Sequence, residues 1–199
     1  MPMWALLVAA LSLQASSSPP RWDVSASVYT YIVPDDSNYA QPTVTADRGR
    51  LHLEGRFNYE ARDAGSLWAG RNFDGGDDSW WSLTPMVGVV FGDTSGIAPG
   101  YRGSISWRRL ELYSESEYVF DTTSSSDSFL YNWSELTVSP VDWLRAGVAV
   151  QRTRAYQTER DLQRGLVIGV THGRLEVSTT VFDLAESKRT VVVMIAAHF

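Results

Sequence analysis

Alternation of apolar and polar side chains at every second residue limits how this chain can fold. It is clearest at 50–62, where Leu51, Leu53 and Phe57 alternate with charged and amide side chains. Successive side chains of a β-strand point to opposite faces, so one face of this strand is apolar and the other is largely charged. The segment 110–121 repeats the pattern. Such strands are expected to separate an apolar environment from a polar one.

The rest of the chain divides into similar segments separated by turn-forming residues. Twelve strand-like segments can be placed, and no useful stretch has helical periodicity. They are 22–33, 39–47, 50–61, 66–73, 79–91, 97–107, 110–121, 129–138, 143–156, 161–171, 174–184 and 189–199. The segment 66–73 has the weakest pattern, and loss of one hairpin would leave ten strands. Pro42, Pro85 and Pro99 lie inside segments and require bulges or strand ends.

Composition restricts the class of protein. The 199 residues suit one domain, and the absence of cysteine excludes disulfides and thiolate chemistry. A net charge of −6 without a basic cluster argues against a nucleic-acid partner. The chain has no apolar run near ~20 residues, which argues against a helical membrane protein. Its basic residues are nearly all arginine, with Lys188 as the exception.

Residues 1–20 have the pattern of a secretory signal peptide. About ten apolar residues precede a region of small residues, which predicts cleavage near 15–18. A buried N-terminal helix is the alternative interpretation. With the signal peptide assigned, residues 21–199 form the single predicted domain of an exported protein.

Periodicity alone does not say whether the apolar face points inward or outward. A soluble lipocalin-like barrel that binds a ligand would bury it, whereas a transmembrane barrel would turn it toward lipid. Aromatic residues gather at both ends of the segments, as expected at two membrane interfaces. The predicted interface aromatics are Trp22, Trp81, Trp107 and Trp143 at one end, and Tyr59, Phe91, Tyr118, Phe120 and Tyr156 at the other. Trp68 and Trp133 fit neither belt.

The C-terminal segment 189–199 is apolar and ends the chain on an aromatic residue. Val193, Ile195 and Phe199 lie on one face of it. This pattern resembles the closing strand, or insertion signal, of bacterial outer-membrane β-barrel proteins. The resemblance implies location in the bacterial outer membrane, and as partners it implies outer-membrane lipid, lipopolysaccharide and the barrel-assembly machinery.

Together these features predict an all-β chain that forms a closed antiparallel up-and-down transmembrane β-barrel. About 12 strands with short loops are expected. The even strand number returns the C-terminus to the side of the membrane where the chain begins.

The polar faces of the segments define the candidate functional residues in the lumen. The predicted lumen-facing polar network is His52, Glu54, Arg56, Asn58, Glu60, Arg102, Arg108, Glu111, Tyr113, Glu115, Glu117 and Glu176, with Arg145 less clearly placed. These residues could line a hydrated channel that selects ions or small solutes. Alternatively, arginine and carboxylate groups could pair across strands and plug the lumen. Arg152 and Arg154 share a face with Val148 and Val150, so a bulge or a strand rising out of the membrane is expected there.

Other chemistry has weaker support. Glu111, Glu115 and Glu117 could bind a cation, but pairing with arginine or solvation is the favoured interpretation. The sequence 74–78 is composed like a calcium loop but lacks EF-hand spacing, so a polar turn is expected. An outer-membrane lipid hydrolase would need a nucleophile and a base, and none of the three histidines lies in such a motif. We therefore predict no catalytic residue, no metal site and no cofactor.

Overall fold

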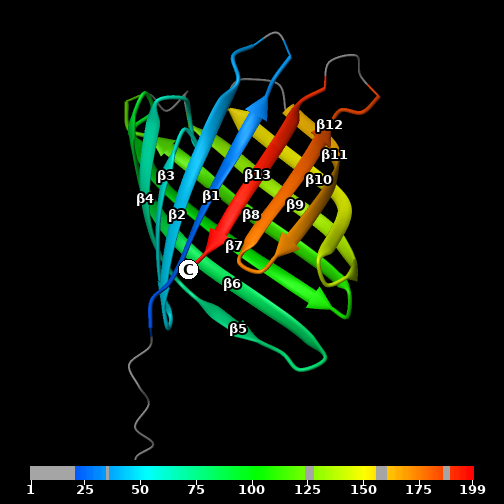
Figure 1. Cartoon of the computed structure of the whole chain (residues 1–199). Coiled ribbons are helices and arrows are strands. Elements are labelled where there is room, and N and C mark those ends of the chain that lie inside the picture. Colours follow the sequence, from blue (N-terminus) through cyan, green and yellow to red (C-terminus); the bar gives the residue numbers. More distant parts are fainter. Residues whose placement is uncertain (1–20, 35, 124–127, 156–160, 186–188) are drawn as a thin grey trace, which may run out of the picture.

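The computed structural model describes residues 21–34, 36–123, 128–155, 161–185 and 189–199, whose strands roll into one barrel (Figure 1). No helix in these ranges is long and apolar enough to cross a membrane. The strands are β1 (Asp23–Ile32), β2 (Tyr39–Arg48), β3 (Leu51–Phe57), β4 (Ala64–Arg71), β5 (Phe73–Gly75), β6 (Ser79–Gly92), β7 (Gly96–Trp107), β8 (Leu110–Asp121), β9 (Phe129–Val141), β10 (Leu144–Ala155), β11 (Asp161–His172), β12 (Leu175–Phe182) and β13 (Val191–His198).

The wall is a closed antiparallel sheet. Neighbouring strands pair in chain order, and β1 pairs with β13 from Ser25 opposite His198 to Ile32 opposite Val191. Both β4 and β5 pair with β6 in a single register, so they are two parts of one strand interrupted near Asn72. The wall therefore has twelve strands, which confirms the predicted fold. Closure through β1 and β13 removes the open edges of the wall, and the short β5, which among the described strands pairs only with β6, extends beyond the β3–β4 ladder.

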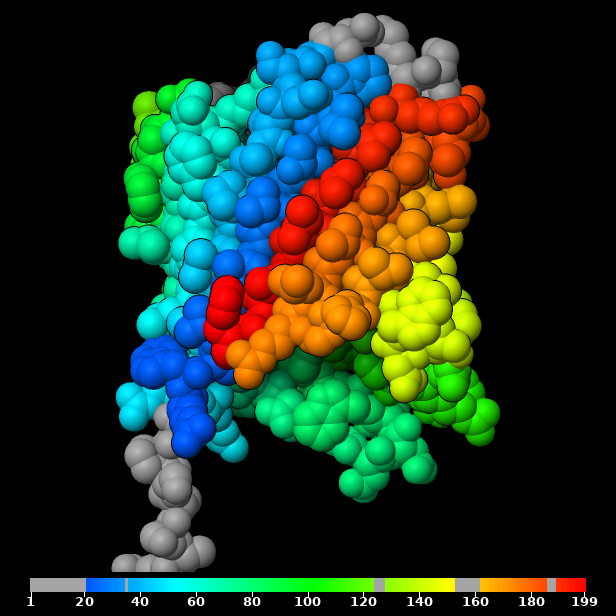
Figure 2. Space-filling view, viewed as in Figure 1, coloured from blue at the N-terminus to red at the C-terminus, as the bar shows by residue number. Residues whose placement is uncertain are grey.

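The pleat of the strands separates an apolar exterior from a mixed interior. Large aliphatic side chains are exposed on the outside at alternate positions, including Val44, Leu67, Val89, Ile97, Ile105, Leu166 and Ile195. The intervening residues point inward, and many of them are buried. Figure 2 shows the outer surface over β2, β1, β13 and β12 as tilted rows of neighbouring side chains. A polar solvent would not stabilise this exterior, whereas lipid would.

Pro42, Pro85 and Pro99 need no register shift, whereas Pro140 of β9 lies where the β9–β10 ladder shifts register. Pro42 pairs with Val28 of β1, one residue beyond the start of the β2–β3 ladder. Pro85 pairs with β7 but faces the gap between β4 and β5, and Pro99 pairs with β6 where the β7–β8 ladder is interrupted. Each proline thus lies beside a local break in one ladder, where its missing N–H leaves no acceptor unpaired.

Both described ends of the chain lie at one end of the barrel (Figure 1). The backbone N–H of Phe199 donates to the carbonyl of Val24 at 2.9 Å, which fixes the end of the closing strand to the start of β1. We call this the terminal end of the barrel. The opposite end, which holds the β1–β2, β3–β4 and β6–β7 connections, is called the loop end.

Candidate functional site: the lumen

Strand β3 places three charged side chains in the lumen. His52, Glu54 and Arg56 occupy alternate positions and are buried, while Leu53 between them is exposed outside. Nδ1 of His52 lies 2.8 Å from Asp47, and Nε2 lies 3.0 Å from Glu54. Buried charged groups require such partners, because burial removes their hydration.

Arg56 is the centre of a group that we call the Arg56 cluster, consisting of Arg56, Glu54, Glu60 and Glu117. Its Nε donates to Glu54 at 2.6 Å and its Nη1 donates to Glu117 at 2.6 Å. Nη1 also lies 3.8 Å from Glu60. The side chains of Arg56, Glu54 and Glu117 are only 1%, 1% and 3% exposed. The fork of the guanidinium therefore joins β3 to β8 across the lumen.

Aromatic rings enclose the same guanidinium. Its central carbon lies 4.2 Å from the ring centroid of Tyr59 and 4.4 Å from that of Trp68. The indole N–H of Trp68 donates to Ser66 at 2.9 Å, and Ser66 in turn donates to Glu60 at 2.5 Å. These cation–π contacts and hydrogen bonds fix the arginine on the sides that its carboxylate partners leave free.

Arg102 of β7 extends the network. It lies 2.9 Å from Glu54 and 3.9 Å from Glu115. The hydroxyl groups of Tyr59 and Tyr113 both donate to Glu115, the latter at 2.6 Å. Charged groups from β3, β7 and β8 are thereby linked into one network at mid-height of the barrel.

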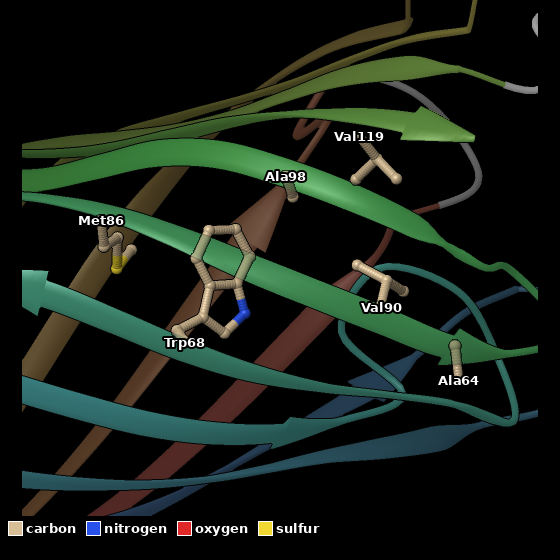
Figure 3. Close-up of a cluster of buried hydrophobic side chains, with 6 residues drawn as sticks. All are labelled: Ala64, Trp68, Met86, Val90, Ala98 and Val119. Atoms are coloured by element: carbon tan, nitrogen blue, oxygen red, sulfur yellow. The ribbon is translucent and has the colours of Figure 1, made fainter. Parts of the chain in front are cut away.

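Two clusters of buried apolar side chains also lie inside the barrel. The Trp68 cluster contains Ala64, Trp68, Met86, Val90, Ala98 and Val119, which come from β4, β6, β7 and β8 (Figure 3). The Trp133 cluster contains Tyr31, Trp133, Ala149, Phe182 and Val192 from the other half of the wall. The rings of Trp133 and Phe182 meet edge to face at 5.3 Å. The lumen is thus packed by large rings as well as by charges.

The indole of Trp68 lies directly against Gly88, and this contact gives a testable prediction. A Cβ at Gly88 would lie 2.5 Å from the indole ring, whereas a Cβ at Gly55 would meet Leu67 at an ordinary 3.6 Å. Gly88→Ala is expected to lower the free energy of unfolding by about 1–3 kcal/mol through overpacking. Gly55→Ala, the matched control, is expected to be neutral or to stabilise by about 0.4–1 kcal/mol. Urea unfolding followed by tryptophan fluorescence measures both, and equal effects would contradict the tight contact.

A cavity of about 320 Å³ opens beyond the network toward the terminal end. Arg145 crosses it and donates to Glu135 at 2.6 Å and to Glu176 at 2.8 Å. Glu111 also lines this cavity. The arginine that the sequence placed least clearly thus bridges two carboxylates inside the barrel.

A second cavity of about 290 Å³ opens toward the loop end. Tyr39, Tyr59 and Tyr131 line it together with amide side chains. At its rim Arg62 donates to Asp36 at 2.8 Å, and this bond lowers the pKa of the Asp36 carboxyl below its usual value. The two cavities approach the Arg56 cluster and the Trp133 cluster from opposite ends.

Most residues of the predicted network meet in the lumen, but two of them differ from expectation. Arg108 lies in the β7–β8 turn, exposed, with its guanidinium 4.8 Å from the centroid of Trp107. Asn58 directly follows β3 with a φ of 57°, and its side chain donates to the carbonyl of Ala40 and accepts from the backbone N–H of Asp63. The positive φ breaks the alternation of β3, because the residues after Asn58 no longer follow the pleat.

The same break corrects the expected position of one aromatic residue. Tyr59 belongs to the lumen and not to an exterior belt, because it contacts Arg56 and Glu115. Among the other predicted interface aromatics, Tyr118 is partly buried beside Phe120, with ring centroids 4.6 Å apart, and Tyr156 lies outside the described residues. Exposed exterior positions are held by Trp22, Trp81, Trp107, Trp143, Phe91 and Phe120.

On the last strand, Ile195 and Phe199 are exposed outside, while Val192 and Met194 are buried inside. Val193 has intermediate exposure and lies on the face of Ile195. The predicted signal peptide lies outside the described residues.

Sequence reasoning missed the aromatic part of the lumen filling. Trp68 and Trp133 fitted neither predicted belt, and both are buried inside. Their positions in the alternating pattern were the available signal. Trp68 follows the exposed Leu67, and Trp133 precedes the outward Ser134, so both tryptophans belong to the inward face of their strands. Phe182 gave no comparable signal.

Comparisons with known proteins agree with this architecture. No protein family and no curated protein matches the sequence. Among solved structures, the barrel is similar to a chain described as "KdgM porin", with a TM-score of 0.64 and 10% sequence identity. The match covers 88% of this chain and 99% of that chain. At this identity the similarity concerns the fold. The chain therefore forms a closed barrel of twelve antiparallel strands with an apolar exterior, and it shares this fold with that porin.

Proposed function

We propose that this protein is an integral outer-membrane barrel whose lumen is plugged at mid-height by ion pairs and aromatic rings. In this state it acts as a structural membrane component and not as an open passive channel, and it catalyses no reaction. Membrane location is supported by the exposed aliphatic exterior and by the fold it shares with a porin. The closing strand with its terminal Phe199 supports insertion by the barrel-assembly machinery.

The proposal of a plug rests on the burial of the lumen-facing side chains. In a water-filled pore these side chains would be exposed to solvent. Here every strand of the wall contributes at least one inward residue that is buried, and these include Tyr31, Thr43, Arg56, Trp68, Met86, Ala98, Glu117, Trp133, Ala149, Val167, Thr180 and Val192. Arginine pairing closes one half of the cross-section, and the Trp133 cluster closes the other.

A narrow gated channel for ions or small solutes is the second candidate. The two cavities favour it, because they bring the terminal end and the loop end close to the plug. Opening would require the Arg56 cluster or the Trp133 cluster to rearrange. Since ion pairs of this kind are expensive to separate in a sealed interior, the closed state should dominate at rest.

Planar-bilayer recording tests the plug. The mature chain is refolded in detergent, and heat-modifiable gel mobility verifies that a barrel has formed. The wild-type barrel is expected to give no discrete conductance steps. Replacing the ionic plug in the triple variant Glu54→Ser, Arg56→Ser and Glu117→Ser should produce steps, because water can then enter the lumen. Arg62→Gln, a change in an exposed pair at the loop end, should stay silent.

Each part of the proposal has its own contrary result. Discrete ion-selective steps from the folded wild-type barrel would reject the plug and favour the channel. A folded protein that remains monomeric without detergent would reject the membrane location and favour the soluble binding module. Turnover of lipid by the folded barrel would favour the hydrolase alternative.

A further inference from the structure

The exterior of β8 to β11 differs from the rest of the apolar wall, because it carries a band of polar side chains. On β8 and β9 the outward residues include Ser114, Ser116, Asn132 and Ser134. The ladders place Ser114 opposite Ser134, and Ser116 opposite Asn132. This band lies between Leu112 and Leu136 on the terminal side and Tyr118 and Leu130 on the loop side. Polar residues at such a position are costly unless they are paired.

The uncharged members of the band satisfy one another. Oγ of Ser114 lies 3.0 Å from Oγ of Ser134 and 3.2 Å from the hydroxyl of Tyr101. The Asn132 amide donates to the carbonyl of Glu115 at 3.0 Å, and the Ser116 hydroxyl donates to the carbonyl of Tyr131 at 2.8 Å. These groups therefore need no external ligand.

Two arginines, Arg152 and Arg164, lie at the loop-side end of the band. Arg152 of β10 pairs with Asn132 and Leu162, and Arg164 of β11 pairs with Val150. The β9–β10 ladder shifts register between Leu144 and Ala146 and is continuous from there to Ala155, so no bulge lies between Val148 and Arg152, and Arg152 keeps the outward face of Val148. Arg164 is exposed between Leu162 and Leu166, which are also exposed.

The register of the β10–β11 ladder makes Arg152 and Arg164 neighbours on the outer face of the wall. Arg152 and Arg164 are diagonal partners on one face of an antiparallel pair, a relation that places such residues about 7–8 Å apart. Within the described chain, Nε of Arg152 is buried and has no hydrogen-bond partner. No aspartate or glutamate occupies the described outward positions of β8 to β11, so this face offers the two arginines no carboxylate.

From this geometry we infer that Arg152 and Arg164 bind the phosphate group of a lipid in the leaflet on the loop side. A phosphomonoester supplies the negative charge that the wall lacks, and its oxygens match the planar fork of a guanidinium. The exposed leucines on either side of Arg164 offer an apolar surface for the acyl chains. The inference rests on the proposed membrane location, but it is independent of whether the lumen is plugged.

A second copy of the chain fits this surface less well. A symmetric pair built on the same face would bring arginines toward arginines, because the face carries no carboxylate to oppose them. The serines and Asn132 are already paired within one barrel. A lipid phosphate therefore neutralises the charge of the two arginines better than a second barrel would.

Native mass spectrometry of the folded barrel, titrated with defined lipids, tests this site. Phosphatidic acid is the probe, diacylglycerol is the same lipid without phosphate, and phosphatidylcholine has its phosphate charge neutralised. The wild-type barrel should bind phosphatidic acid most tightly. Arg152→Gln combined with Arg164→Gln should raise its Kd by at least about tenfold, as loss of charge-assisted hydrogen bonds predicts. Arg152→Lys with Arg164→Lys should lie between the two.

Arg174→Gln is the matched control, because Arg174 is an exposed arginine in the β11–β12 turn at the terminal end. Its Kd should remain within about twofold of the wild type. Unchanged binding in the double glutamine variant, equal loss in the control, or equal affinity for diacylglycerol would overturn the site. A two-copy species that binds lipid no differently in the variants would point to a protein interface instead. Heat-modifiable gel mobility distinguishes these outcomes from a failure to form the barrel. If the double glutamine variant does not fold, the single variants Arg152→Gln and Arg164→Gln are measured in its place.

Discussion

Arg56→Gln is expected to lower the free energy of unfolding by about 3–5 kcal/mol, because it leaves buried carboxylates without their cation. Glu54 and Glu117 each lie 2.6 Å from the guanidinium and are nearly inaccessible to water. Glutamine is too short to reach both carboxylates, and it carries no charge. The variant should also lose the stacking of the guanidinium between Tyr59 and Trp68.

Urea unfolding of the detergent-folded barrel, followed by tryptophan fluorescence, measures this loss. Arg62→Gln is the control, because Arg62 also pairs with a carboxylate, yet Arg62 and Asp36 are 45% and 55% exposed. An exposed pair of this kind contributes less than about 1 kcal/mol. If both variants lost the same small amount, the Arg56 cluster would have to be hydrated, and the plug would lose its main support.

A compensating variant separates the charge effect from a packing effect. Glu54→Leu, Arg56→Met and Glu117→Leu together remove the charges as a set and retain apolar volume. A buried ion network replaced in this way is often neutral or stabilising, so the triple variant should recover much of the loss. A triple variant as unstable as Arg56→Gln would show that shape, and not uncompensated charge, dominates at this position.

The wall of the barrel was predictable from local sequence, because the alternation of apolar and polar residues within each strand distinguishes its two faces. Leu51 and Leu53 against His52 and Glu54 define the inside and outside of β3 without knowledge of any partner strand. Strand number and closure then follow from counting such segments. The break between β4 and β5 escaped this reasoning, since it arises where Pro85 of the neighbouring strand cannot complete a ladder.

The content of the lumen was predictable only in part. Parity identified Glu54, Arg56 and Glu117 as inward residues, but their meeting depends on the curvature that brings β3 opposite β8. The positive φ of Asn58 reversed the position of Tyr59, and a single residue in a turn gives little warning of such a change. Ring packing between Trp133 and Phe182 joins residues far apart in the sequence, so alternation within one strand could not reveal it.

Phe182→Ala is expected to destabilise the barrel by about 3–5 kcal/mol, the range for loss of a buried aromatic side chain. Phe182 is fully buried, and its ring meets that of Trp133 at 86°. Trp133 in turn meets Tyr29 edge to face at 6.4 Å. The cavity left by alanine would lie beside Trp133, which also lines the cavity at the terminal end.

Combining Phe182→Ala with Arg56→Gln tests whether the two halves of the plug act independently. The aromatic half and the Arg56 cluster share no hydrogen bond within the described residues, so their free-energy losses should add within about 0.5 kcal/mol. Urea unfolding of both single variants and the double variant gives this interaction energy. Strong coupling would mean that the two halves stabilise each other as one cooperative unit. Additivity would mean that each half stabilises the barrel independently of the other.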